Sequence, residues 1–172
     1  MDLEKFIRDI ADFPKPGIVF KDITPLLAEP DAFINSLKIM EVDLKKYNVH
    51  KILAIESRGF IFGAALAARN RIGFIPVRKP GKLPFTTIRE SYELEYGKNI
   101  LEIHHDAVKP GEKVAIVDDL LATGGTAQAT IRMVKKLGAE VSCLLFLVEL
   151  DFLNGREKLS GYPVHTYIHF KE

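Results

Sequence analysis

The sequence has one cysteine, no long apolar run and almost no excess of charge of either sign. A single cysteine permits no internal disulfide, and Cys143 lies in the apolar run "CLLFLV", where a buried, unreactive side chain is the simplest interpretation. Runs of that length are far too short to span a bilayer. Lys plus Arg number 24 and Asp plus Glu 23, a formal net charge of +1. This balance provides no overall field to attract nucleic acid or an anionic membrane.

The first residues, "MDLEKFIRDIADF", mix acids with bases and contain no apolar signal region. We therefore expect a soluble, cytoplasmic protein with no membrane and no nucleic acid as partner. The 172 residues suit a single domain over 1–172, and a hydrophobic content of 47% argues against disorder.

Alternating apolar runs and helical patterns predict an α/β fold. Helices are expected over residues 3–11, 31–47, 60–69 and 126–137, and strands over 51–56, 73–78, 113–117, 141–149 and 164–170. The segment Asp12 to Pro30 has four prolines, which exclude regular helix or central strand. "YELEYGKNILEIH" predicts a β-hairpin over 92–104 that turns at Gly-Lys-Asn, after a long polar loop over 79–91. The repeated alternation predicts a mostly parallel central sheet flanked by helices.

The motif "VAIVDDLLATGGTAQAT" places two carboxylates next to a glycine turn. Asp118 and Asp119 follow the predicted strand over 113–117, and ligands of parallel sheets bind beyond the carboxyl ends of the strands. Gly124 and Gly125 allow a tight turn, Thr123 and Thr126 add hydroxyls, and the next helix presents free N–H groups. These features predict an anion-binding turn.

The turn lacks the Gly-Lys-Thr or Gly-Lys-Ser of a nucleoside-triphosphatase. A ligand with hydroxyls at one end and phosphate at the other, such as ribose 5-phosphate, would suit carboxylates beside an anion-binding turn. An ordinary glycine turn capped by the aspartates is the alternative.

Five further blocks carry a family resemblance. "VAIVDDLLATGGT" resembles the phosphoribosyl-pyrophosphate signature of type I phosphoribosyltransferases, and four other blocks narrow the resemblance to the adenine phosphoribosyltransferases: "ESRGFIFG", "RKPGKLP", "SYELEYGK" and "LVELDFLNGREKL". With "FPKPGIVFKDIT", the similarity covers nearly the whole chain. It implies the type I phosphoribosyltransferase fold, with a β-hairpin flap and a small hood from the N-terminal and C-terminal segments.

The resemblance implies transfer of 5-phosphoribosyl from phosphoribosyl pyrophosphate to N9 of adenine, giving AMP and pyrophosphate. The 5-phosphate would bind Ala122, Thr123, Gly124, Gly125 and Thr126, and the ribose hydroxyls would bind Asp118 and Asp119. The pyrophosphate end would need cations, for which the available cluster is Arg58, Arg78, Lys79 and Lys82. Mg²⁺ would be carried on substrate oxygens with few protein ligands. The resemblance also implies a homodimer and a cis peptide at Glu56–Ser57.

For the base, the resemblance implies that Phe20 stacks on adenine while backbone groups of Val19 and Lys21 bind its edge, with Leu150 on the other side. It makes Glu95 an acid/base residue near N7 and lets Tyr96 help to close the site. Arg58, Glu95, Asp118 and Asp119 are thus the catalytic candidates.

Two other functions stay open. One is a 6-oxopurine phosphoribosyltransferase, and the other is a non-catalytic regulator that senses phosphoribosyl pyrophosphate on the same fold. Histidines at 104, 105, 165 and 169 have no spacing that predicts a metal site.

Overall fold

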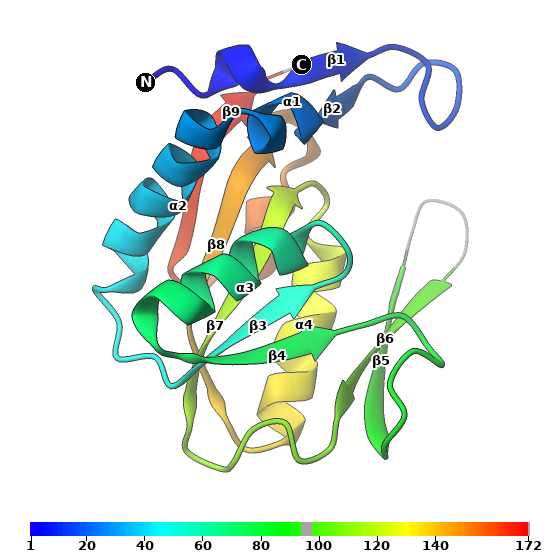
Figure 1. The fold of residues 1–172 in the computed structure, drawn as a ribbon. Coiled ribbons are helices and arrows are strands. Elements are labelled where there is room, and N and C mark those ends of the chain that lie inside the picture. Colours follow the sequence, from blue (N-terminus) through cyan, green and yellow to red (C-terminus); the bar gives the residue numbers. More distant parts are fainter. Residues whose placement is uncertain (94–97, 172) are drawn as a thin grey trace. The chain divides into compact units, whose positions relative to one another are not determined.

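The computed structural model describes residues 1–93 and 98–171 of the chain (Figure 1). The contacts within the chain define two compact units, Met1–Ile39 and Met40–Glu172. The single domain expected over 1–172 therefore stays a prediction. Among the helices of the described residues, none combines the length and the apolar character needed to cross a membrane.

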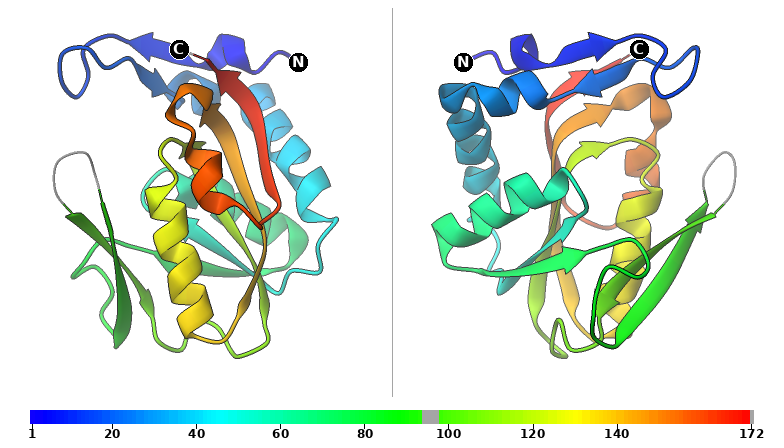
Figure 2. Two further views of the ribbon diagram at one scale, coloured as in Figure 1. Left: turned by 180° about the vertical axis from the view of Figure 1, so that it is seen from behind. Right: turned by 45° about the vertical axis from the view of Figure 1, so that its right-hand side comes forward.

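The larger unit is built on a parallel sheet of five strands in the order β4-β3-β7-β8-β9. Its strands are β3 (Lys51–Ile55), β4 (Gly73–Val77), β7 (Lys113–Leu121), β8 (Glu140–Leu150) and β9 (Val164–Phe170). Helices α3 (Gly59–Asn70) and α4 (Gly125–Lys136) cover opposite faces of this sheet (Figures 1 and 2). The predicted mostly parallel sheet flanked by helices is confirmed.

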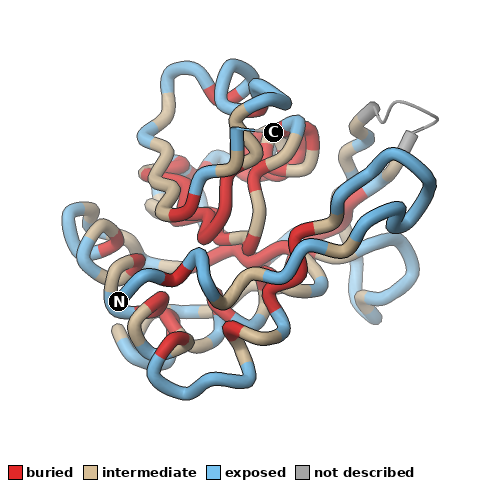
Figure 3. Tube along the Cα trace, turned by 90° about the horizontal axis from the view of Figure 1, so that it is seen from above, coloured by how far each residue is buried: buried red, intermediate tan, exposed pale blue. Residues whose placement is uncertain are grey.

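Burial on both faces explains why the inner strands are almost entirely apolar. In β8 every residue from Cys143 to Val148 is buried, and Ile52 to Ile55 are buried in β3. Figure 3 colours the chain trace by burial and shows continuous buried stretches that alternate with exposed segments. One helix of the unit, α4, ends where Gly138 adopts a φ of +76° and Ala139 N–H donates to the Val134 carbonyl, a common helix stop.

Strand β7 is longer than predicted. It runs to Leu121 instead of ending at Val117, because Leu120 and Leu121 pair with Val148 and Glu149 of β8. The expectation that Asp118 and Asp119 lie just beyond a strand is therefore wrong, because both belong to the last residues of β7. They still belong to the carboxyl end of the sheet.

The hairpin is also longer than predicted. Its strands β5 (Thr87–Glu93) and β6 (Lys98–His104) pair from Thr87 with His104 to Glu93 with Lys98. Part of the predicted loop over 79–91 is therefore strand. The prediction that the hairpin turns at Lys98 and Asn99 is wrong, because both residues belong to β6. Leu101 and Ile103 are buried in the core, and this tertiary packing extends the strands beyond the alternating pattern.

The smaller unit contains the 3₁₀ turn η1 (Glu4–Phe6), strands β1 (Arg8–Ile10) and β2 (Phe20–Asp22), helix α1 (Thr24–Ala28) and the start of α2 (Pro30–Leu44). The predicted helix over 3–11 is wrong, because β1 pairs with β2. The Arg8 guanidinium donates to the Asp22 carboxylate at 2.7 Å and reinforces that pairing. The exclusion of helix from Asp12–Pro30 is also wrong at α1, where Pro25 lies in the first turn and removes no helical hydrogen bond.

Helix α2 starts in the smaller unit and ends in the larger one. Its observed bounds agree with the helix predicted over 31–47, apart from the last residues. Helices α3 and α4 likewise agree with the predictions over 60–69 and 126–137 to within a residue at each end.

Candidate active site

Two carboxylates lie side by side near the end of β7. Asp119 is 4% exposed, and Asp118 is half-buried. The Asp119 backbone N–H donates to Asp118 Oδ1 at 2.9 Å. Neighbouring residues of a strand point to opposite faces, so the two side chains reach different surroundings from one short stretch of backbone.

Arg58 provides the countercharge for this pair. Its Nε lies 2.8 Å from Asp119 Oδ2. The contact is an ion pair without the alignment of a hydrogen bond, since Oδ2 is buried and accepts no hydrogen bond from any described residue. At this short distance the two groups still attract each other, because attraction between opposite charges depends little on angle. The Arg58 guanidinium is thus paired with Asp119, one of the predicted catalytic residues.

Arg58 reaches β7 because the turn between β3 and α3 passes very close to it. The Glu56–Ser57 peptide in this turn is cis, as the resemblance implied. A Cβ placed on Gly59 would lie 2.7 Å from Asp118 Oδ1 and 3.1 Å from Asp118 Cα. No side chain fits there. Gly59 is a site residue that sequence reasoning missed, although the glycine directly after "ESR" was the available signal.

The electrostatics of the carboxylate pair favour a bound proton or a ligand. Burial and the neighbouring Asp119 carboxylate raise the pKa of Asp118 well above its ordinary value. Burial also raises the pKa of Asp119, against the opposing effect of the Arg58 guanidinium. Hydroxyl donors or a cation at this position would relieve the cost of holding two buried charges together.

The anion-binding turn lies between β7 and α4. Gly124 precedes the helix with a φ of +76°, a conformation that favours glycine. The free N–H groups and positive dipole end of α4 face the turn. A small cavity of about 60 Å³ is lined by Asp118, Ala122, Thr123, Gly124 and Thr126, among others. The structure thus brings the predicted phosphate residues together beside one of the predicted carboxylates.

The proposed pyrophosphate cations surround another carboxylate. Arg78 Nε donates to Glu56 Oε2 at 2.7 Å, and Lys82 Nζ lies 3.4 Å from Glu56 Oε1. Burial favours the neutral form of Glu56 and by itself would raise its pKa. Three interactions outweigh burial and lower the pKa of Glu56: hydrogen bonds from the Arg78 side chain and the Lys79 backbone N–H, and the positive charge of Lys82. Sequence reasoning missed Glu56, the first acidic residue after the buried strand β3. Arg78 and Lys82 are held in place by it.

A larger cavity of about 360 Å³ joins these groups. Its lining includes Glu56, Ser57, Arg58, Lys79, Tyr92, Asp118, Asp119, Ala122 and Thr126. That volume is in the range of small-molecule sites. The carboxylate pair and one end of the anion-binding turn therefore face a single space together with Arg58 and Lys79.

Other predicted site residues lie elsewhere in the chain. Within the smaller unit, the Phe20 ring meets the Phe13 ring edge-on at 5.1 Å, Val19 is exposed, and the buried Lys21 ammonium pairs with Asp9 at 2.9 Å. Leu150 ends β8 and is half-buried. Glu95 and Tyr96 lie outside the described residues.

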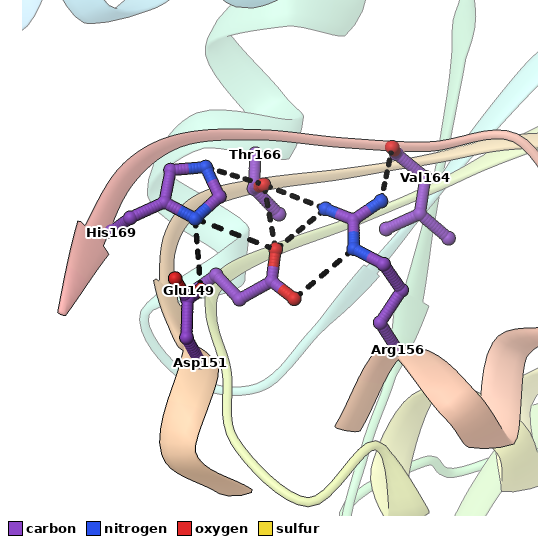
Figure 4. A network of polar contacts seen from close by, with 6 residues as sticks. All are labelled: Glu149, Asp151, Arg156, Val164, Thr166 and His169. Atoms are coloured by element: carbon purple, nitrogen blue, oxygen red, sulfur yellow. Dashed lines mark hydrogen bonds and ion pairs between the residues drawn. The ribbon is translucent and has the colours of Figure 1, made fainter. Parts of the chain in front are cut away.

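One histidine lies in a group that its spacing in the sequence does not reveal. His169 has two carboxylate neighbours, Asp151 and Glu149, close enough to form a potential metal-binding group. Tertiary pairing of β8 with β9 brings them together, which spacing in the sequence does not reveal. Both oxygens of Glu149, however, already accept hydrogen bonds from Arg156 (Figure 4).

Comparison with known proteins agrees with this geometry. The family model described as "Phosphoribosyl transferase domain" matches residues 31–166. The chain is 56% identical over 168 residues to the adenine phosphoribosyltransferase of Thermotoga neapolitana, covering 98% of this chain and 99% of that one. A similar relative from Carboxydothermus hydrogenoformans is 53% identical over 170 residues, with 99% of this chain and 100% of that one covered.

Solved structures give the same result. The crystal structure of adenine phosphoribosyltransferase from Thermoanaerobacter pseudethanolicus has a TM-score of 0.96 and 53% identity, with 98% of each chain covered. The enzyme from Saccharomyces cerevisiae, complexed with adenine and an imino-altritol bisphosphate, has a TM-score of 0.88 and 40% identity, with 96% of each chain covered.

The carboxylate pair makes a prediction about stability. Asp118 has a raised pKa in the folded state, so the folded protein binds its proton more tightly than the unfolded chain does. Stability is therefore lost as pH rises from the unfolded value, near 3.8, through the folded pKa. Asp118→Asn should raise the thermal unfolding midpoint at about pH 8 and have little effect near pH 4. Calorimetry at both pH values measures the difference.

The exposed Asp106→Asn variant is the matched control and should behave like the original protein at both pH values. A lower unfolding midpoint for Asp118→Asn at the higher pH would contradict the assigned cost of this charge.

Proposed function

Because the chain belongs to the adenine phosphoribosyltransferase family, we propose that it transfers 5-phosphoribosyl from phosphoribosyl pyrophosphate to N9 of adenine. The products are AMP and pyrophosphate, a reaction of purine salvage. One observation in particular supports this proposal: a single cavity joins a carboxylate pair to a helix-initiating anion-binding turn. A phosphorylated sugar has the complementary groups, hydroxyls at one end and phosphate at the other.

In this proposal the donor spans the cavity. Ala122 to Thr126 hold the 5-phosphate through backbone N–H groups, and Asp118 and Asp119 hold the ribose hydroxyls. As the bond to pyrophosphate breaks, positive charge develops on the sugar ring, and fixed carboxylates nearby stabilise it. Arg58 sets the position of Asp119 by its ion pair and lines the same cavity.

The pyrophosphate end is assigned to Arg78, Lys79 and Lys82. Glu56 orients the first and the last of these cations while partly neutralising them. A pyrophosphate anion arriving there would compete with the Glu56 carboxylate for the same donors. Arginine can bind phosphate oxygens through two N–H groups, so Arg78 is suited to bridge both anions.

Magnesium is proposed as a companion of the substrate. The carboxylate oxygens near the cavity suit a hard cation, but Asp119 already faces Arg58 and Glu56 already faces Arg78. These groups form no cage of protein ligands. Mg²⁺ would take most of its ligands from pyrophosphate, ribose and water, and would supply charge neutralisation at the leaving group.

The base is assigned to Val19, Phe20, Lys21 and Leu150. Phe20 is proposed to stack on adenine, and the backbone of Val19 and Lys21 to bind its edge. The pairing of the Lys21 side chain with Asp9 leaves the main-chain role unaffected. Adenine offers an acceptor at N1 and a donor at its amino group, whereas 6-oxopurines present the reverse pattern. Glu95 and Tyr96 are proposed as acid/base and closing residues.

Cytoplasmic location, a homodimer and the absence of a nucleic-acid partner are also part of the proposal. The near-neutral net charge of +1 supports the last point.

A panel of bases tests the function most directly. Adenine, hypoxanthine, guanine and xanthine are each supplied with phosphoribosyl pyrophosphate and Mg²⁺, and nucleoside monophosphate is measured. Only adenine should give product, because the proposed backbone contacts match its edge alone. The double variant Asp118→Asn/Asp119→Asn is the matched negative control and should lose most turnover while remaining folded.

Product from hypoxanthine or guanine instead of adenine would indicate the 6-oxopurine enzyme. Binding of phosphoribosyl pyrophosphate without turnover, with nucleic-acid affinity that weakens steeply with salt, would indicate the regulator.

Glu95 can be tested as an acid/base residue. Glu95→Gln keeps the shape of the side chain and removes its ability to exchange a proton near N7. The turnover number should fall by roughly 10²- to 10⁴-fold. Glu93→Gln, two residues earlier, is the matched control and should retain normal turnover. An unchanged rate in Glu95→Gln would remove this residue from the mechanism.

A further inference from the structure

A polar network at the ends of β8 and β9 has no part in the mechanism above. Arg156 lies in the 3₁₀ turn η3 (Gly155–Leu159) and donates two hydrogen bonds to the Glu149 carboxylate. Its Nε lies 3.1 Å from Glu149 Oε1 and its Nη2 lies 2.5 Å from Oε2 (Figure 4). The same guanidinium donates to the Val164 carbonyl at 2.9 Å and to Thr166 Oγ1 at 2.8 Å. One side chain therefore ties η3 to two strands of the sheet.

The network is well suited to hold η3 in a fixed position relative to β8 and β9. The Glu149 side chain is only 8% exposed. Burial favours its neutral form, but hydrogen bonds from Arg156 and Thr166 outweigh this effect and lower the pKa of Glu149. A planar guanidinium with two parallel contacts to a buried carboxylate has little freedom to rotate or shift. Because both Glu149 oxygens are occupied in this way, its grouping with Asp151 and His169 does not make a metal site.

The residue before Arg156 touches the anion-binding turn directly. A Cβ placed on Gly155 would lie 2.0 Å from the Ala122 carbonyl oxygen and 2.9 Å from Gly124 N. A Cβ placed on Gly124 would lie 2.4 Å from the Gly155 carbonyl oxygen. Backbone therefore packs on backbone, with no side chain between. The left view of Figure 2 shows η3 beside the first turn of α4.

We propose that Arg156 is a positioning residue for the 5-phosphate, because its two hydrogen bonds to Glu149 hold Gly155 against the Ala122–Gly124 turn. The proposal rests on the proposed function for the identity of the ligand. Gly155 forms the rear wall of the turn, so a shift of η3 would displace the backbone N–H groups that receive the phosphate. Arg156 and Glu149 themselves stay outside the lining of the cavity that joins the carboxylate pair to this turn.

Three variants test the proposal. Arg156→Gln removes the charge and the double contact, Arg156→Lys restores the charge alone, and Gly155→Ala inserts one methyl group between η3 and the turn. Gly155 has no positive φ, so alanine acts there only through its contacts with the Ala122–Gly124 turn. The measurements are kcat, KM for each substrate, the unfolding midpoint, and the Kd of ribose 5-phosphate by calorimetry.

Matched controls come from the same unit. Arg69→Gln removes another half-exposed guanidinium paired with a carboxylate, that of Glu41 at 2.8 Å. Gly73→Ala adds a methyl group whose nearest neighbour is the flexible Lys51 side chain at 3.2 Å. Both should keep the original constants for both substrates.

For Arg156→Gln and Gly155→Ala, KM for phosphoribosyl pyrophosphate and Kd for ribose 5-phosphate should rise by roughly 10- to 100-fold. KM for adenine should stay unchanged, and Arg156→Lys should fall between Arg156→Gln and the original protein. If Arg156→Gln does not fold, Gly155→Ala carries the test.

Unchanged donor constants in a folded Arg156→Gln or Gly155→Ala protein would overturn the proposal. So would equal losses for adenine and donor, which indicate a general structural effect. If the original protein fails to turn over adenine, the proposed function fails, while the Kd of ribose 5-phosphate still decides the positioning role.

Discussion

The structure depends on close backbone approach at the carboxyl end of β7. Gly59 brings the turn after β3 to within contact of Asp118, where a Cβ would lie 2.7 Å from the carboxylate. On the other side of the strand end, Gly124 and Gly155 meet with no side chain between them. These contacts bring three separate segments of the chain close together at the end of β7. Arg58, the carboxylate pair and the anion-binding turn share a cavity because the glycines allow it.

The close packing also places cationic side chains next to carboxylates near the cavity. Arg58 faces Asp119, and both Arg78 and Lys82 face Glu56, so three cationic side chains at or near the cavity have carboxylate partners. Such pairing holds long side chains in one orientation before any ligand arrives, which reduces the entropy lost on binding. An anionic ligand that bound Arg78 or Lys82 would compete with Glu56 for them. The raised pKa of Asp118 shows that the carboxylate side of the cavity is the less well balanced part.

Much of this arrangement could be predicted from sequence, for physical reasons that differ from residue to residue. The parallel sheet follows from buried apolar runs, and Asp118, Asp119 and the Ala122–Thr126 turn follow from a motif whose parts are adjacent in the chain. Prediction failed where distant segments decide the structure. Strand β7 extends to Leu121 because β8 pairs with it, and residues 8–10 form a strand because β2 lies alongside. Glu56 and Gly155 have roles that only their spatial neighbours reveal.

The division of the chain bears on how specificity is organised. The residues assigned to the sugar donor belong to the unit Met40–Glu172, and those assigned to the edge of the base belong to the unit Met1–Ile39. The donor side is specified by groups that any phosphoribosyl transfer requires: hydroxyl acceptors, an anion-binding turn and cations. In the proposed function, selection of adenine needs an N–H and a carbonyl at the correct spacing, a role assigned to the backbone of Val19 and Lys21. If these assignments hold, base preference depends on a few residues near Phe20, while donor binding depends on the close packing of Gly59, Gly124 and Gly155 around the end of β7.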